Sequence, residues 1–199
     1  MLNADELLTR FNPETGAIDG CKAAIRRLSD LNNLFVNKAA YAAAMSNGNP
    51  TVYTVSTLEP AKGEGQLHLG VGVLMPGRIG DEYYFTKGHL HSWGTAAEFY
   101  IGIKGRGMMV LQDESSLQSV VLDLLPNSIV YVPGNTAHRT VNVGDTPLIY
   151  VGIYPAEAGH DYAALEKQTF RKVIVAKNNT PTVLDRKDFD DNGRVFTIN

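Results

Sequence analysis

The pattern of apolar and polar residues changes near residue 50 of this 199-residue chain. From Thr51 onward, short runs rich in Val, Ile, Tyr and Phe are separated by Pro, Gly and Asn, which is typical of strands joined by turns. This spacing favours a sandwich or a closed barrel over alternating βαβ units, so we expect an all-β fold. The predicted strands span residues 52–58, 66–75, 82–86, 98–104, 107–112, 117–124, 129–132, 138–143, 148–154 and 170–176.

One helix is predicted before residue 50. Asn37 is a suitable N-cap, and the alanine-rich stretch 38–45 that follows it favours a helix. The Asn-Gly-Asn-Pro run at 47–50 ends that helix, because proline and glycine interrupt helical geometry.

The remainder of the N-terminal region carries weaker signals. Residues 21–31 are predicted to form either a short helix or an arm lying on the barrel. We expect a single domain in two parts: an N-terminal arm and helix over 1–50, packed outside, and a barrel with a C-terminal extension over 51–199. Apolar side chains at the end of the arm could bury surface against a partner chain: Leu31, Leu34, Phe35 and Val36.

Composition and charge exclude several classes of protein. Apolar residues make up 44% of the chain, the net charge is −3 and the pI is about 5.9, which does not suggest a nucleic-acid or membrane-surface partner. No stretch approaches the ~20 apolar residues that span a bilayer, and the acidic N-terminus is not a signal peptide. The single cysteine, Cys21, cannot form an internal disulfide and fits a reducing compartment. We therefore expect a cytoplasmic protein without nucleic-acid or membrane partners.

Three of the five histidines fall at the starts of predicted strands. His89 and His91 are two residues apart, so on a strand both imidazoles point to one face and can share a metal ion at about 2.0–2.2 Å. Glu98 begins the next strand, on the polar face that it shares with Tyr100, and His138 begins a later strand. Three imidazoles and one carboxylate suit iron, manganese, nickel or zinc, with room for water or substrate.

Two stretches around these residues resemble the motifs of the cupin superfamily. The first is Gly-His-Leu-His at 88–91, followed by Glu98. The second is Pro-Gly-Asn-Thr-Ala-His at 133–138, followed by Asn142. Asn135 stands where the second motif usually has glycine, and asparagine tolerates the left-handed conformation, so we expect the turn to survive.

Further segments resemble the cupin-type phosphoglucose isomerases, the archaeal class that also occurs in some bacteria. The resemblance runs from about residue 12 to 176 and is carried by residues 14–16, 26–30, 84–89, 132–133, 137–142, 153–156 and 158–162. It implies a cupin barrel (a double-stranded β-helix, similar to a jelly roll), a homodimer, and a sugar-phosphate substrate. The implied reaction interconverts glucose 6-phosphate and fructose 6-phosphate, a step of glycolysis and gluconeogenesis. The implied cofactor is one divalent metal ion per chain, Fe²⁺ before Mn²⁺, Ni²⁺ or Zn²⁺, held by His89, His91, Glu98 and His138.

The resemblance also implies substrate contacts. It assigns the phosphate to a threonine, a glycine and two tyrosines: Thr86, Gly88, Tyr154 and Tyr53. Tyr100 could reach a sugar hydroxyl, and His160 matches a family position near the substrate. Lys87 and Arg139 are each one residue from an inward position, so strand alternation is expected to turn them outward.

Gly72 departs from the family pattern. The resemblance leads us to expect a threonine near this position that helps to hold the phosphate, and glycine supplies no hydroxyl. Gly72→Thr is therefore expected to tighten binding, and the remaining phosphate contacts are expected to matter more.

Two mechanisms fit the implied reaction. A divalent cation can polarise the C1 and C2 oxygens, and Glu98 is the candidate base that abstracts the C2 proton to give a cis-enediol. A metal-bound carboxylate is a weaker base, so either Glu98 leaves the metal or a hydride shifts directly. Other functions stay open, because cupin folds host many chemistries. These are another cupin sugar-phosphate isomerase, an oxygenase that consumes O₂, and a sugar-binding cupin without turnover.

Overall fold

Antiparallel strands make up most of the computed structural model, which describes residues 7–167 and 169–189. The strands are β1 (Ala23–Arg27), β2 (Thr51–Leu58), β3 (Leu67–Leu74), β4 (Arg78–Ile79), β5 (Glu82–Tyr83), β6 (Glu98–Lys104), β7 (Gly107–Asp113), β8 (Ser119–Leu124), β9 (Ile129–Val132), β10 (Thr136–Asn142), β11 (Leu148–Pro155), β12 (Lys172–Lys177) and β13 (Thr180–Asp185). The helical elements are η1 (Leu28–Leu31), α2 (Lys38–Ser46), α3 (Ala163–Lys167) and η2 (Arg186–Asp188).

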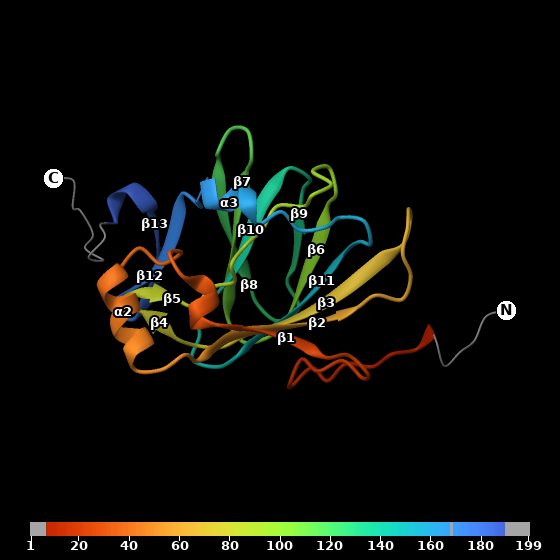
Figure 1. Ribbon diagram of the computed structural model, residues 1–199, viewed down its shortest axis with the longest axis horizontal. Coiled ribbons are helices and arrows are strands. Elements are labelled where there is room, and N and C mark those ends of the chain that lie inside the picture. The colour runs from red at the N-terminus through yellow and green to blue at the C-terminus, as the bar shows by residue number, and fades with distance from the viewer. Residues whose placement is uncertain (1–6, 168, 190–199) are drawn as a thin grey trace.

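The strands form a barrel of two main sheets. The larger sheet has the order β1-β2-β3-β11-β6-β9, and the sheet that faces it has the order β10-β7-β8. A third sheet, β13-β12-β5-β4, lies at one end together with α2 (Figure 1). Neighbouring strands within each sheet are antiparallel. The all-β, cupin-type barrel that the sequence predicts is therefore confirmed.

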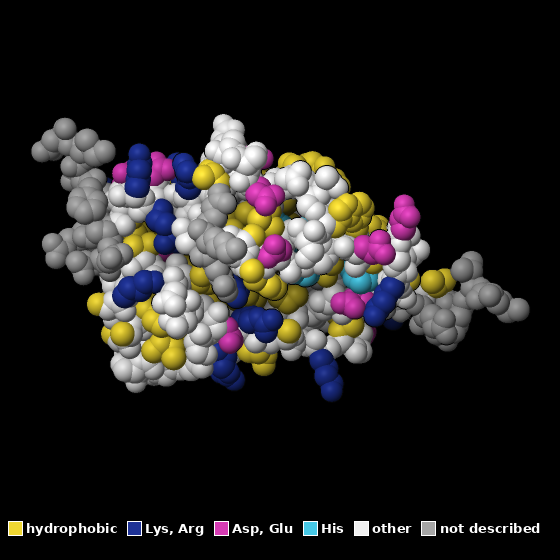
Figure 2. All heavy atoms as spheres, turned by 45° about the horizontal axis from the view of Figure 1, so that its top comes forward, with side chains coloured by type: hydrophobic (Ala, Val, Ile, Leu, Met, Phe, Trp, Pro, Cys, Tyr) yellow, Lys and Arg dark blue, Asp and Glu magenta, His cyan; other side chains and the backbone are white. Residues whose placement is uncertain are grey.

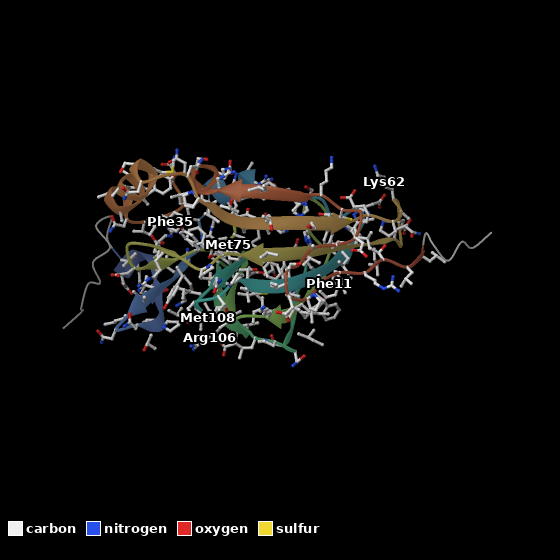
Figure 3. The ribbon with its side chains drawn as sticks, turned by 90° about the horizontal axis from the view of Figure 1, so that it is seen from below. Phe11, Phe35, Lys62, Met75, Arg106 and Met108 are labelled. Atoms are coloured by element: carbon white, nitrogen blue, oxygen red, sulfur yellow. The ribbon has the colours of Figure 1, made fainter. Side chains whose placement is uncertain are left out.

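Alternation along the strands of the larger sheet separates an inner face from an outer face. Gly70 and Gly72 of β3 line the internal cavity, whereas Val71 between them is buried on the outer face with Ile18. Figure 3 views this sheet from below, with Phe11 of the N-terminal segment lying over it. The inner face is thereby left for the functional site.

The end of the N-terminal arm packs into the chain's own core. Leu31, Phe35 and Val36 are buried, and the ring of Phe35 lies 4.4 Å from that of Phe85, centroid to centroid. Leu34 is partly buried against the same core, so these four side chains do not offer the partner surface that was expected of them. Burying a Leu or Phe side chain contributes about 1.5–3 kcal/mol, so they anchor the arm firmly to the barrel.

The region 21–31 differs from its prediction. It forms the strand β1 and then the short 3-10 helix η1, and Ile25 of β1 pairs with Thr54 of β2. The run Ala-Ala-Ile-Arg-Arg has no clear period, so pairing with the free edge of β2 decides its conformation. The larger sheet thus includes residues from before position 50, where the boundary between the N-terminal arm and the barrel was expected.

Several local predictions are confirmed, and others shift. The side chain of Asn37 caps α2 by accepting a hydrogen bond from the backbone N–H of Ala40 at 2.9 Å. The predicted strand at 82–86 shortens to β5, and β13 was not predicted. β13 contains Pro181, which an edge strand tolerates because one of its sides needs no ladder hydrogen bond. No helix within the described part of the chain is long and apolar enough to cross a bilayer.

Candidate metal centre and adjoining cavity

The four predicted metal ligands converge from three parts of the chain. His89 and His91 lie in the segment before the loop that leads to β6, Glu98 begins β6, and His138 lies in β10. A β-bridge joins two of them, since the backbone N–H of His89 donates to His138 O at 3.2 Å and that of His138 donates to His89 O at 3.0 Å. One ligand atom from each of the four side chains lies within 4.8 Å of the others.

Asn135 forms the turn that delivers His138 to this centre. Its φ of 56° is left-handed, which confirms the expectation that asparagine can replace the usual glycine there. The strand β10 begins at Thr136, so His138 is its third residue and not its first.

Backbone carbonyls fix the orientation of two of the imidazole rings. Nδ1 of His91 lies 3.0 Å from Ala96 O, and Nδ1 of His138 lies 3.0 Å from Thr136 O. A carbonyl oxygen only accepts, so both Nδ1 atoms carry a proton, and in the neutral imidazoles both Nε2 atoms present a lone pair. Backbone carbonyls commonly hold metal-binding imidazoles in this way.

The Nε2 atoms of His91 and His138 both face the carboxylate of Glu98. Its Oε2 lies 3.2 Å from His91 Nε2 and 3.1 Å from His138 Nε2. These three atoms and His89 Nε2 are buried and have no hydrogen-bond partner among the described residues. Atoms this close repel one another unless a cation lies among them, either a proton on an imidazole or a metal ion. The donor set, three nitrogens and one oxygen, therefore fits a divalent transition metal.

The charge states of these groups also suit a cation. Burial raises the pKa of Glu98, but the imidazoles of His138 and His91 outweigh it and lower the pKa to about 2. Burial, reinforced by the neighbouring imidazoles, holds the pKa of His89 well below its ordinary value. At neutral pH, Glu98 is thus ionised and His89 is neutral, which are the forms that bind metals.

A cavity of about 220 Å³ adjoins the candidate ligands. It lies on the inner face of the larger sheet and is lined by residues 24, 26, 53, 55, 57, 70, 72, 86, 88, 89, 98, 100, 138, 150, 152, 154, 160 and 162. Gly152 of β11 makes room beside the metal centre, because a Cβ at this position would lie 2.6 Å from Glu98 Oε1. On the face shown in Figure 2, histidine atoms are visible among apolar and acidic side chains.

All six residues predicted to contact substrate line this cavity: Thr86, Gly88, Tyr100, Tyr154, His160 and Tyr53. Thr86 Oγ1 accepts a hydrogen bond from the backbone N–H of Thr140 at 3.0 Å, so its own proton remains available to a ligand. Gly88 adopts a left-handed φ of 78°, which glycine adopts without strain. The ring of His160 lies 4.4 Å from that of His89, which brings it close to the metal centre.

The sequence did not reveal several other residues of the cavity wall. Ala24 and Arg26 reach it from β1, Tyr150 from β11 and Tyr162 from the segment before α3. Arg26 belongs to a stretch that carries the family resemblance. Because β1 was not recognised as a strand, alternation could not show that Arg26 faces inward.

Arg139 faces away from the cavity, as alternation predicts, but it is not turned to solvent. Its side chain is 6% exposed, and its guanidinium lies 4.2 Å and 4.3 Å from the ring centroids of Phe85 and Phe170. Burial, with the nearby Arg186, lowers the pKa of Arg139 to about 9. Its Nη2 donates to Lys87 O at 2.9 Å, which braces the backbone between Thr86 and Gly88 from behind.

Comparison with known proteins gives a consistent result. The family model described as glucose-6-phosphate isomerase (GPI) matches residues 25–191. The glucose-6-phosphate isomerase of Pyrococcus furiosus is 42% identical over 172 residues, covering 86% of this chain and 90% of that protein. The same-named protein of Thermococcus onnurineus is 43% identical over 177 residues, covering 88% and 92%. Among solved structures, an oxalate oxidase is 17% identical, covering 58% of this chain and 57% of its own, with a TM-score of 0.49.

Proposed function

The chain belongs to the glucose-6-phosphate isomerase family, and from this premise we propose that it interconverts glucose 6-phosphate and fructose 6-phosphate. The observation that carries the proposal is that a candidate metal centre lies directly beside a polar cavity. Three imidazoles and a carboxylate converge on one buried point, and this point opens into a cavity rich in hydroxyl groups. An aldose–ketose isomerase needs both features, one at the reacting carbons and one along the sugar.

His89, His91, Glu98 and His138 would hold one divalent metal ion, with Fe²⁺ as the first choice and Mn²⁺, Ni²⁺ or Zn²⁺ as alternatives. Such an ion would supply Lewis-acid polarisation of the substrate oxygens at the reacting carbons. Proton transfer and substrate binding are assigned to side chains that line the cavity.

Glu98 is proposed as the base that takes the proton from C2 and returns it to C1. It is 4% exposed and lines the cavity, so a substrate carbon can approach it without intervening bulk water. Its two oxygens have different surroundings, since Oε2 faces the imidazoles whereas Oε1 lies beside Gly152. The carboxylate thus has an oxygen outside the cluster of ligand atoms. A direct hydride shift is the competing mechanism, in which Glu98 is not a base.

The phosphate group is proposed to lie at the end of the cavity formed by Thr86, Gly88, Tyr53 and Tyr154. The backbone N–H of Lys87 donates to Tyr53 Oη at 3.4 Å, which places this phenol beside the segment that contains Thr86 and Gly88. Tyr100 and His160 lie on the cavity wall nearer the metal centre and are proposed to contact the sugar.

The proposed function is tested by following glucose 6-phosphate formation from fructose 6-phosphate in a coupled assay, with and without a chelator. We expect turnover that is lost on chelation and restored by a divalent metal. Free glucose and fructose should be poor substrates. Absence of turnover in the metal-loaded protein would contradict the proposal, and binding without turnover would point to a sugar-binding cupin. Consumption of O₂ would point to an oxygenase.

We further propose that two copies associate and that residues 1–50 and 51–199 work as one domain. Arg26 of β1 and Tyr53 of β2 line one cavity, which supports the single domain. Phe99, Ile129 and Tyr131 are exposed where β6 meets the edge strand β9, and they offer an apolar surface to a second copy. Tyr131→Glu should lower the mass measured by light scattering if this surface is used. The single cysteine supports a cytoplasmic location.

A further inference from the structure

We propose that Arg26 binds the phosphate group of the substrate and supplies the positive charge of the phosphate site. The inference rests on the proposed function and deepens it, since it adds a residue for recognising the charged end of a sugar phosphate. It concerns a side chain on the first strand of the larger sheet, whose register with β2 determines where it points.

The alternation of β1 directs Arg26 toward the cavity. Ala24 and Arg26 both line the cavity, as do Tyr53 and Val55 on the neighbouring strand β2. Arg26 is directly opposite Tyr53 in the antiparallel register. Directly opposed residues on paired strands have their Cβ atoms about 4.5–5.5 Å apart, so Arg26 lies beside Tyr53 at this end of the cavity. Its Nη1 donates a long hydrogen bond to Ile25 O at 3.4 Å, and the other N–H groups of the guanidinium remain for a ligand.

The charge distribution in the cavity favours a phosphate contact with Arg26. Among the described residues that line it, Arg26 is the one lysine or arginine. The other polar groups at this end are neutral hydroxyls and backbone amides, whereas a phosphate monoester carries about −1.5 to −2 charges at pH 7. An arginine fork can donate two parallel hydrogen bonds to phosphate oxygens, which a hydroxyl cannot do.

Two nearby cations do not themselves line the cavity. Arg139 lies behind the cavity wall, where it donates to Lys87 O. Lys87 Nζ lies 5.2 Å from the ring centroid of Tyr162. Burial raises the pKa of the Tyr53 phenol, but Arg26 and Arg139 act in the opposite direction, which is consistent with a positive potential at this hydroxyl.

The position of Arg26 suits a direct test. Every residue of β1 is exposed, so Arg26→Met removes the charge without opening a hole in the core. Arg27 is a matched control, because it is the adjacent arginine on the same strand but does not line the cavity. The side chain of Arg27 instead donates from Nη1 to Asn49 O at 3.2 Å.

The experiment compares Arg26→Met, Arg26→Lys and Arg27→Met with the wild type, all loaded with the same metal. For Arg26→Met we expect KM for fructose 6-phosphate to rise by roughly 10–100-fold, the range of one charge-assisted contact, while metal content and thermal midpoint stay constant. Arg26→Lys should recover part of the loss, because it keeps the charge without the fork. The difference between wild type and Arg26→Met should shrink as salt is added.

Two results would overturn the inference. One is a KM for Arg26→Met within about twofold of the wild type, which is less than any charge-assisted contact provides. The other is an equal rise in Arg27→Met, which would mean that net surface charge and not contact is responsible.

A binding measurement separates this inference from the proposed function. Inorganic phosphate is titrated into the zinc-loaded protein and followed by calorimetry. If the wild type binds phosphate and Arg26→Met binds it about 10-fold less tightly, Arg26 is a phosphate ligand even if no isomerase turnover is found. If the two proteins bind phosphate equally, Arg26 is not a ligand, whatever the turnover.

Discussion

The phenol ring of Tyr150 occupies the space directly over Gly72. The two residues are cross-strand partners in the register of β3 and β11. A Cβ on residue 72 would lie 2.5 Å from Oη and 2.6 Å from Cε2 of Tyr150. The ring is buried and packs beside Tyr100, with centroids 5.5 Å apart, so it cannot easily move aside. Tyr150 therefore brings a hydroxyl to the part of the cavity where the family pattern suggested a threonine hydroxyl.

This relationship reverses the expectation for Gly72→Thr. The added side chain must displace a buried ring, so we expect the free energy of unfolding to fall by about 1–3 kcal/mol, the usual cost of overpacking. Binding of fructose 6-phosphate should not tighten.

A double-mutant cycle with Tyr150→Leu, measured by urea unfolding, checks the cause of that loss. If the clash is responsible, Gly72→Thr should cost less in the Tyr150→Leu background than in the wild type. Strictly additive costs would show that the ring of Tyr150 is not the obstacle.

Glu98→Gln separates metal binding from proton transfer. Glutamine still offers an oxygen ligand but has no basicity, so we expect metal to be largely retained and turnover to fall by ~10²–10⁴. Metal analysis and the coupled assay are run on the same sample. Near-normal turnover would remove Glu98 as the base and favour a hydride shift. Exchange of the substrate C2 hydrogen with solvent deuterium in the wild type would support proton transfer.

His138→Ala should lose most of the bound metal. The substitution removes one of four ligands and leaves Glu98 Oε2 without a neighbour at 3.1 Å. His68→Ala is the control, because His68 is also buried but its Nε2 lies 2.8 Å from Ala61 O, outside the cluster. Metal is measured by mass spectrometry after dialysis. Full occupancy in His138→Ala would be incompatible with the proposed centre.

Thr86→Ala tests the phosphate end of the cavity. Loss of its hydroxyl should raise KM for fructose 6-phosphate by roughly 10–100-fold, equivalent to ~1.5–3 kcal/mol, with metal content unchanged. Thr86→Ser keeps the hydroxyl and should behave nearly as the wild type, which controls for the backbone contact with Thr140. If both Thr86→Ala and Tyr154→Phe leave the kinetics untouched, the phosphate binds elsewhere.

The buried carboxyl of Glu82 should make stability depend on pH. Burial raises its pKa above the ordinary value of 4.5, although the backbone N–H of Val36 donates to Oε2 at 2.6 Å. The folded protein thus binds this proton more tightly than the unfolded chain. The corresponding stability is complete below pH 4.5 and is lost as the pH rises through the folded pKa.

Glu82→Gln removes this titration but keeps an oxygen acceptor for Val36. Relative to the wild type, the unfolding free energy of Glu82→Gln should therefore increase as the pH rises above 4.5. Urea unfolding at several pH values measures the difference, and Glu64→Gln, at an exposed glutamate, controls for net charge. A difference that is constant with pH would rule out a raised pKa at Glu82.

The sequence by itself determined most of the strands between residues 51 and 177, the capped helix and the four candidate metal ligands. These features depend on local signals: a period of two, an N-cap, and histidines spaced so that a strand presents them on one face. The spacing of residues within two short motifs carries the information on the candidate ligands. His89, His91, Glu98 and His138 could therefore be selected as candidates without knowing which strands are neighbours.

Only the tertiary structure decided the rest of the site. The conformation of β1, and with it the direction of Arg26, depends on pairing with β2, which no local period encodes. The ring of Tyr150 over Gly72 and the burial of Arg139 between Phe85 and Phe170 are contacts between distant segments. Strand alternation predicts the face of the sheet from which a side chain projects. The residues that this side chain contacts depend on how other elements pack against that face.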